Sequence, residues 1–88
     1  MLPKYYIYSN TQTCPPCREL KRQLDEKFPE WVNYINYVDI YNMTSKDIFH
    51  ITKINVRGLP SFTSESDVIS VGYSPAILNK IIELCTSE

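Results

Sequence analysis

The fold is decided by residues 5–28, which read YYIYSNTQTCPPCRELKRQLDEKF. Residues 5–8 are aromatic and β-branched, and they predict a short buried strand. The small polar stretch that follows predicts a loop. Pro15 and Pro16 then suit the first turn of a helix, because backbone N–H groups lack intrahelical partners there. The apolar residues after them recur every three or four positions and predict an amphipathic helix that ends before Pro29.

The middle of the chain predicts a second strand and a second helix. Residues 32–40 are rich in Tyr, Val and Ile, and the strand pattern is clearest from Tyr34 onward. Thr44 and Asp47 resemble a capping box, which marks the start of a helix. The apolar stripe expected on this helix consists of Ile48, Phe49 and Ile51.

The last part of the chain predicts a β-hairpin and a third helix. Residues 61–63 and 67–71 fit two antiparallel strands joined by a short polar turn. Ser74 is a natural N-cap, Pro75 is a natural first helical residue, and apolar residues follow the helical period as far as Cys85. The predicted order is therefore β-α-β-α-β-β-α. Its first strand–helix–strand unit implies parallel strands, and helices must cover both faces of the mixed sheet.

Composition excludes several classes of protein. The chain has 88 residues, of which 43% are hydrophobic and 22% charged, so it suits one small core and not two. The net charge of −1 gives no basic excess for nucleic-acid binding. No hydrophobic stretch is long enough to span a bilayer, and residues 1–6 lack the apolar run of a signal peptide. We therefore expect a single domain over residues 1–88, cytoplasmic, with no nucleic-acid or membrane partner.

The three cysteines carry most of the functional information. Because three is an odd number, a fully paired disulfide scaffold is excluded. Cys14 and Cys17 are close in sequence, and such a pair in a reducing compartment is more often catalytic or metal-binding than structural. Cys85 lies on the apolar stripe of the last helix, where we expect a small buried side chain.

The positions of Cys14 and Cys17 predict different roles for the two thiols. Residues three apart across one helical turn are close enough for a disulfide. Cys14 is near the helix start, where the dipole favours a thiolate, and Arg18, Lys21 and Arg22 add positive charge nearby. Cys17 is one turn deeper on the apolar face, where burial raises the pKa of a thiol. We therefore expect Cys14 to attack a substrate disulfide and Cys17 to release the product.

A metal site is the competing hypothesis. A structural zinc site usually needs four ligands, and Cys85 and His50 are the only other obvious soft or imidazole ligands. Pro15 and Pro16 lack the N–H groups that commonly support metal-bound sulfur, which favours redox chemistry. The alternatives left open are zinc or an iron–sulfur cluster on the Cys14–Cys17 pair, and a module that binds proteins without catalysis.

Four stretches of the chain occur in an order typical of one superfamily. They are residues 8–17, 38–40, 56–61 and 72–75. In chain order, they resemble the active-site loop, the second strand, the cis-proline segment and the turn into the last helix of thioredoxin-superfamily proteins. Within that superfamily, the resemblance is to the small glutaredoxin-like branch. The last stretch is similar to redoxins that serve ribonucleotide reductase. The resemblance implies sheet order 2-1-3-4, with the first and third helices on one face and the second helix on the other.

The resemblance also implies a function and a set of site residues. It implies a thiol–disulfide oxidoreductase that uses Cys14 and Cys17 without a metal or organic cofactor. It implies a cis Leu59–Pro60 bond beside the cysteines, where a substrate backbone can pair. The expected substrate-binding residues are Tyr8, Pro15, Pro16, Leu59, Pro60, Gly72 and Tyr73. For Tyr8 and Tyr73, simple packing is the alternative to a rim around the thiols.

Departures from the family pattern leave the partners open. At four places this sequence differs from glutaredoxins that bind glutathione: Thr11, Pro16, Gly58-Leu59, and one glycine, Gly72, followed by Tyr73 and Ser74. The reductant is therefore either glutathione or a thioredoxin-reductase-type flavoenzyme. We expect a monomer whose clients are protein disulfides, with ribonucleotide reductase among the candidates. Asp39 either accepts the Cys17 proton or caps a turn, and the cap is the favoured interpretation.

Overall fold

A four-stranded mixed sheet forms the centre of the protein. The computed structural model describes residues 4–87. Its strands are β1 (Tyr5–Ser9), β2 (Ile35–Asp39), β3 (Ser61–Thr63) and β4 (Val68–Val71), in the order β2-β1-β3-β4. β1 pairs parallel with β2 and antiparallel with β3, and β3 pairs antiparallel with β4. The predicted strand order is therefore confirmed.

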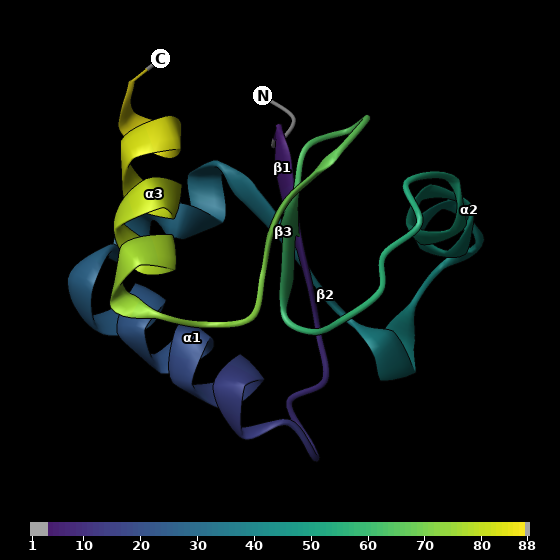
Figure 1. The fold of residues 1–88 in the computed structure, drawn as a ribbon, viewed down its shortest axis with the longest axis horizontal. Helices are drawn as coiled ribbons and strands as arrows, with labels where there is room; N and C mark the ends of the chain where they lie inside the picture. The colour runs from purple at the N-terminus through teal and green to yellow at the C-terminus, as the bar shows by residue number, and fades with distance from the viewer. Residues whose placement is uncertain (1–3, 88) are drawn as a thin grey trace.

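Three α-helices cover the two faces of this sheet. They are α1 (Pro15–Lys27), α2 (Ser45–Lys53) and α3 (Pro75–Thr86). Figure 1 shows α1 and α3 on one face and α2 alone on the other. Two short 3₁₀ turns, η1 (Pro29–Asn33) and η2 (Ile40–Asn42), flank β2. This is a thioredoxin-like topology, as the sequence predicts.

Local capping explains where α2 and α3 begin. The Thr44 hydroxyl accepts the Asp47 N–H at 3.2 Å, and the Asp47 carboxylate accepts the Thr44 N–H at 3.0 Å. This is the predicted capping box, which satisfies two backbone donors that the helix leaves without partners. At α3, the Ser74 hydroxyl accepts the Ile77 N–H at 3.2 Å, and Pro75 takes the first helical position.

The hydrophobic core lies between the sheet and the α1–α3 layer. Ile7 and Phe62 from the sheet are buried there, and the Phe62 ring stacks on Tyr5 at 5.2 Å between centroids. Cys85 is 1% exposed in this core, as predicted for a small packing side chain. The helical residues buried in the same cluster are Leu20, Leu24, Leu78 and Ile81. Within residues 4–87, no helix combines the length and apolar character needed to cross a membrane.

Two local expectations need correction. The apolar stripe expected on α2 is largely exposed, because Ile48 is 51% and Phe49 71% exposed, while Ile51 is half-buried. None of the residues of α2 is fully buried. α2 lies against the sheet through His50, whose ring lies 4.4 Å from that of Tyr6. The strand expected over residues 32–40 is shorter, because the η1 turn continues to Asn33 and buries Trp31 in the core.

Candidate functional site

Cys14 lies at the N-cap of α1, directly after the loop that leaves β1. Its backbone is extended, and its Sγ accepts the N–H of Cys17 at 3.3 Å. Pro15 and Pro16 occupy the first helical positions and carry no N–H. Cys17 is therefore the first residue of the helix that can donate to the capping sulfur. Both prolines are exposed and flank the half-buried Cys14 side chain.

Cys17 faces the interior one turn further along α1. Its side chain is fully buried, and its Sγ accepts the N–H of Asn10 at 3.4 Å. Burial raises the pKa of the Cys17 thiol to about 12, while the Asn10 hydrogen bond acts in the opposite direction. The neighbouring Cys14 thiol raises this pKa further. Both cysteines of the pair are reduced thiols, one accessible and one buried.

The segment before β3 forms the wall opposite Cys14. The Cys14 thiol donates to the carbonyl oxygen of Leu59 at 3.9 Å, and the Leu59–Pro60 peptide bond is cis. The cis bond implied by the family resemblance is thus confirmed, and it lies beside the cysteines. The Gly72 N–H donates to the Pro60 carbonyl at 2.8 Å, so the turn before α3 is fixed to the same wall.

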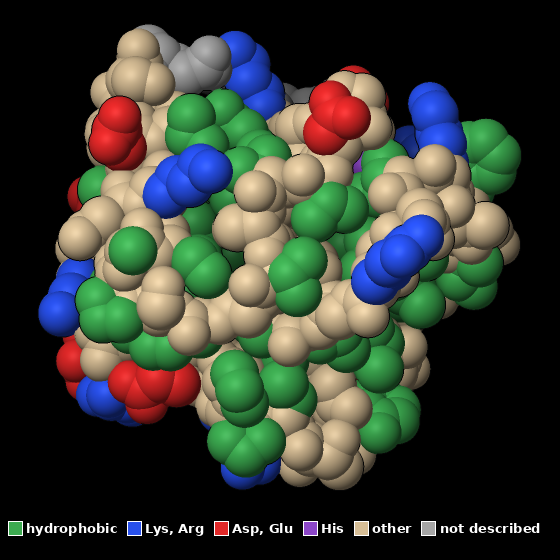
Figure 2. Space-filling model, viewed as in Figure 1, with side chains coloured by type: hydrophobic (Ala, Val, Ile, Leu, Met, Phe, Trp, Pro, Cys, Tyr) green, Lys and Arg blue, Asp and Glu red, His purple; other side chains and the backbone are tan. Residues whose placement is uncertain are grey.

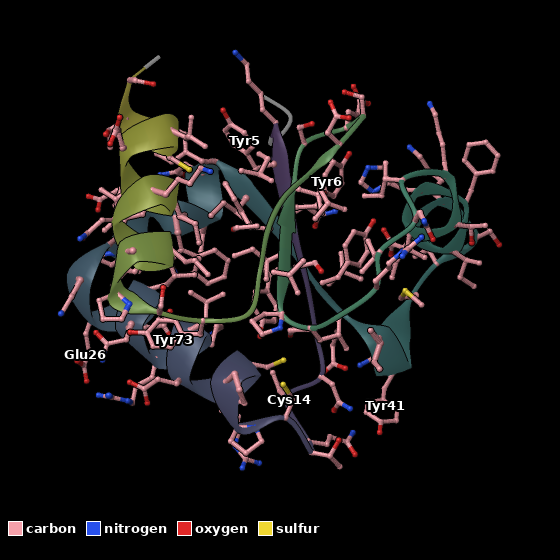
Figure 3. All side chains as sticks on the ribbon, viewed as in Figure 1. Tyr5, Tyr6, Cys14, Glu26, Tyr41 and Tyr73 are labelled. Atoms are coloured by element: carbon pink, nitrogen blue, oxygen red, sulfur yellow. The ribbon has the colours of Figure 1, made fainter. Side chains whose placement is uncertain are left out.

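Two glycines shape this wall. A Cβ on Gly58 would lie 2.9 Å from Cγ1 of Val71, so a larger residue here would require the segment or the Val71 side chain to shift. Gly72 has φ of +88°, a backbone conformation that favours glycine. Tyr73 follows it, half-buried and packed against the core. Figure 3 shows Tyr73 and Tyr41 on either side of Cys14 at the end of the molecule where α1 begins.

Tyr8 does not line a rim around the thiols. Its side chain is fully buried, because it lies in the central strand β1 and points to the face that α2 covers. Its hydroxyl lies 2.5 Å from Nδ1 of His50 on α2. Burial, followed by the charge of Asp47 and by Tyr6, raises the pKa of Tyr8 to about 12. The packing interpretation of Tyr8 therefore replaces the expected substrate contact.

The three basic residues near the helix start differ in their surroundings. Arg18 is exposed and donates from one guanidinium nitrogen to the Gln12 carbonyl at 3.2 Å. It therefore lies along the loop of residues 10–13 that precedes Cys14. Lys21 pairs with Asp25 at 2.8 Å. Arg22 pairs with Glu19 and Glu26 on the surface of α1. Of the three, Arg18 is thus the one whose charge lies against the loop before Cys14.

Asp39 joins the active-site loop to the end of β2. Its carboxylate accepts the Thr11 hydroxyl at 2.6 Å and the Tyr41 N–H at 3.0 Å. The Thr11 hydrogen bond and then the Tyr41 one lower the pKa of this carboxyl. Asp39 is the N-cap of η2, which confirms the cap interpretation.

The possible additional metal ligands lie elsewhere in the fold. Cys85 is in the core beneath α1 and α3, and His50 is on α2 with Nε2 at 3.1 Å from the Ser64 carbonyl. Within the described range 4–87, no three His, Cys, Asp or Glu side chains converge as a metal site. Among the described residues, the Cys14–Cys17 pair accordingly has no third protein ligand beside it.

Sequence reasoning missed Asn10 and His50. Asn10 follows β1 as a turn residue, and its side chain accepts two backbone N–H groups of the loop. Asn in a polar loop is a known turn former, so a local signal for Asn10 existed. No local pattern singles out His50, because its contacts are with strands distant in sequence.

Comparisons with protein-family models and with curated proteins find no match to this sequence. The site is therefore defined by its own geometry. It is a Cys14–Cys17 pair at the first turn of α1 in a thioredoxin-like fold, with an accessible thiol and a buried thiol one helical turn apart. Such a pair is placed to open and close a disulfide without unfolding the helix.

Proposed function

We propose that the protein is a thiol–disulfide oxidoreductase, a small glutaredoxin- or thioredoxin-like electron carrier that reduces protein disulfides. The observation that carries this proposal is the environment of Cys14. Its sulfur accepts the Cys17 N–H at a helix start, while the Cys17 thiol lies buried behind it. A hydrogen-bond donor and the positive end of the helix dipole both favour the thiolate that attacks disulfides.

The proposed cycle has two exchange steps. The Cys14 thiolate attacks one sulfur of a client disulfide, forms a mixed disulfide and releases the other client sulfur as a thiolate, which takes up a proton. Cys17 then gives its proton to solvent and attacks the Cys14 sulfur. The Cys14–Cys17 bond forms, the Cys14–client bond breaks, and the second client thiol leaves. Two electrons pass from the dithiol to the client.

Clients dock, in this proposal, on the residues that surround Cys14. Pro15 and Pro16 are exposed, and Figure 2 shows hydrophobic side chains over the end of the molecule where α1 begins. The Leu59 and Pro60 segment opposite offers backbone that an extended client segment can pair with. Gly72 and Tyr73 adjoin this segment. We name ribonucleotide reductase as the client to test, because residues 72–75 resemble redoxins that serve it.

An activity assay tests the proposal directly. The protein is incubated with insulin and NADPH, supplied either with glutathione and glutathione reductase or with thioredoxin reductase. The proposal predicts insulin reduction with one of the two systems, and the productive system identifies the reductant. The matched control is the Cys14→Ser/Cys17→Ser double variant, which is expected to be inactive. A folded protein that reduces insulin with neither system would refute the proposal.

A further inference from the structure

A single residue, Asn10, contacts both cysteines through its backbone. Its N–H donates to the Cys17 Sγ at 3.4 Å, and its carbonyl accepts the Cys14 N–H at 3.2 Å. Asn10 comes immediately after β1, so the central strand fixes where this peptide begins. The position of each thiol relative to the sheet therefore depends on the conformation of residue 10.

The Asn10 side chain fixes that conformation. Its Oδ1 accepts the N–H of Gln12 at 3.1 Å and of Thr13 at 3.2 Å, and its Nδ2 donates to the Thr13 hydroxyl at 2.7 Å. Such a turn holds a loop in one shape through side-chain hydrogen bonds to its own backbone. The Asn10 side chain therefore holds the loop in shape, and its backbone N–H donates to the Cys17 sulfur.

The second exchange step needs a donor at this place. Cys17 must carry negative charge on a fully buried sulfur while it attacks Cys14. Burying an unpaired charge is costly, and a hydrogen bond to the charged form reduces that cost. The Asn10 N–H donates to the Cys17 sulfur, whereas the Cys17 N–H donates to the Cys14 sulfur. The two thiols thus depend on different backbone groups.

We propose that Asn10 controls the resolving step: its N–H stabilises the Cys17 thiolate, and its side chain is the positioning group that aims this N–H. The inference rests on the proposed function. In the step concerned, Cys17 loses a proton to solvent, its sulfur bonds to the Cys14 sulfur, and the leaving thiolate takes the electron pair of the broken disulfide. Asn10 exchanges no proton or electron.

The test separates the two steps with 5,5′-dithiobis(2-nitrobenzoate). Cys14 releases the first nitrothiobenzoate when the mixed disulfide forms, and Cys17 releases the second when it resolves that disulfide. Stopped-flow absorbance then gives one rate for each step. All proteins carry Cys85→Ala, so that only the Cys14–Cys17 pair reacts.

The Asn10 backbone N–H is removed by replacing the Ser9–Asn10 amide with an ester, which puts an oxygen atom in place of the N–H group. The full chain is assembled by ligating a synthetic segment of residues 1–13 to a segment that begins at Cys14. We expect the second phase to slow about tenfold or more, because a hydrogen bond to a charged group is lost, and its pH profile to move to higher pH. The first phase is expected to change less than about twofold, because it does not use this N–H.

A matched ester at Gln12 removes an N–H that donates to Asn10 and not to sulfur. We expect it to slow the second phase much less than the ester at Asn10 does. Among recombinant variants, Asn10→Ala is expected to slow the second phase, and Asn10→Ser to restore most of it, since serine retains an oxygen for the turn. A merely structural role would affect both phases alike.

The outcomes distinguish this inference from the function on which it rests. If the unaltered protein shows no second phase, the proposed dithiol cycle is wrong. If it shows both phases and the Asn10 ester leaves the second phase unchanged, the cycle stands and the role of Asn10 is refuted. Equal slowing of both phases by the ester would also refute it.

Discussion

The Tyr8 hydroxyl lies 2.5 Å from Nδ1 of His50 and joins the central strand to α2. On its other side, His50 Nε2 faces the carbonyl oxygens of Ser64 at 3.1 Å and Glu65 at 3.0 Å. Because carbonyls only accept hydrogen bonds, Nε2 carries a proton and donates it to this turn. One side chain therefore holds α2 to β1 and to the turn between β3 and β4.

We predict that Tyr8→Phe destabilises the protein by about 1 kcal/mol, because it removes the hydrogen bond between the Tyr8 hydroxyl and the half-buried His50 ring. Hydrogen exchange should show that the protection of backbone amides decreases mainly in α2. Tyr41→Phe is the control, since Tyr41 is exposed and we expect no measurable change in its unfolding free energy. Unchanged unfolding and exchange in Tyr8→Phe would show that His50 does not anchor the helix.

The hydrogen bond between Thr11 and Asp39 is expected to make stability depend on pH. The folded-state pKa of Asp39 lies below the ordinary Asp value, so its contribution is present above about pH 4 and is lost as pH falls through the folded pKa. Thr11→Val should therefore lower the unfolding free energy more at neutral pH than in acid. Urea titrations at several pH values measure this, with exposed Thr52→Val as control. If Thr11→Val lowered the unfolding free energy equally at every pH, the hydrogen bond to Asp39 would not be the source of the pH dependence.

A side chain added at Gly58 is expected to lower the unfolding free energy, because it would meet Val71. Gly58→Ala should cost about 1–3 kcal/mol, because its Cβ would lie 2.9 Å from Cγ1 of Val71. In a Val71→Ala background the same substitution should cost much less, since the opposing methyl group is gone. Thermal unfolding of the four proteins gives the coupling energy directly. A cost that does not depend on Val71 would contradict the steric explanation.

Cys85 is expected to be dispensable for turnover. It lies in the core, 1% exposed, near the C-terminal end of α3, which Figure 1 shows at the opposite end of the molecule from the start of α1. Cys85→Ala should retain insulin reduction while losing about 1 kcal/mol of unfolding free energy, typical of a small core truncation. The two measurements are made on the same preparation. Loss of activity in a folded Cys85→Ala protein would require a redox role for this residue.

The features that sequence predicted well depend on local signals. The starts of the three helices at Cys14, Thr44 and Ser74 follow from capping residues and prolines that act within a few positions. The burial of Cys17 and the partial exposure of Cys14 follow from one helical turn and the apolar period. The cis bond before Pro60 and the strand order came from family resemblance, because pairing among distant strands leaves no local pattern.

The features that sequence missed depend on tertiary contacts. Ile48 and Phe49 fit a buried stripe, yet α2 docks through His50 and leaves both exposed. Tyr8 is an aromatic next to the active-site loop, but strand alternation in β1 turns it toward α2. Asn10 carries a local signal as a turn former, but its contacts with both cysteines are visible only in the folded loop.

The central claim is that Cys14 attacks and Cys17 resolves. It is tested most directly by intact-mass measurement of Cys14→Ser and Cys17→Ser proteins, each in the Cys85→Ala background, after reaction with an oxidised client peptide. We predict that Cys17→Ser accumulates a stable mixed disulfide on Cys14, because the resolving thiol is gone. Cys14→Ser is expected to remain unmodified, because Cys17 is buried. A mixed disulfide that forms in Cys14→Ser and not in Cys17→Ser would contradict the account.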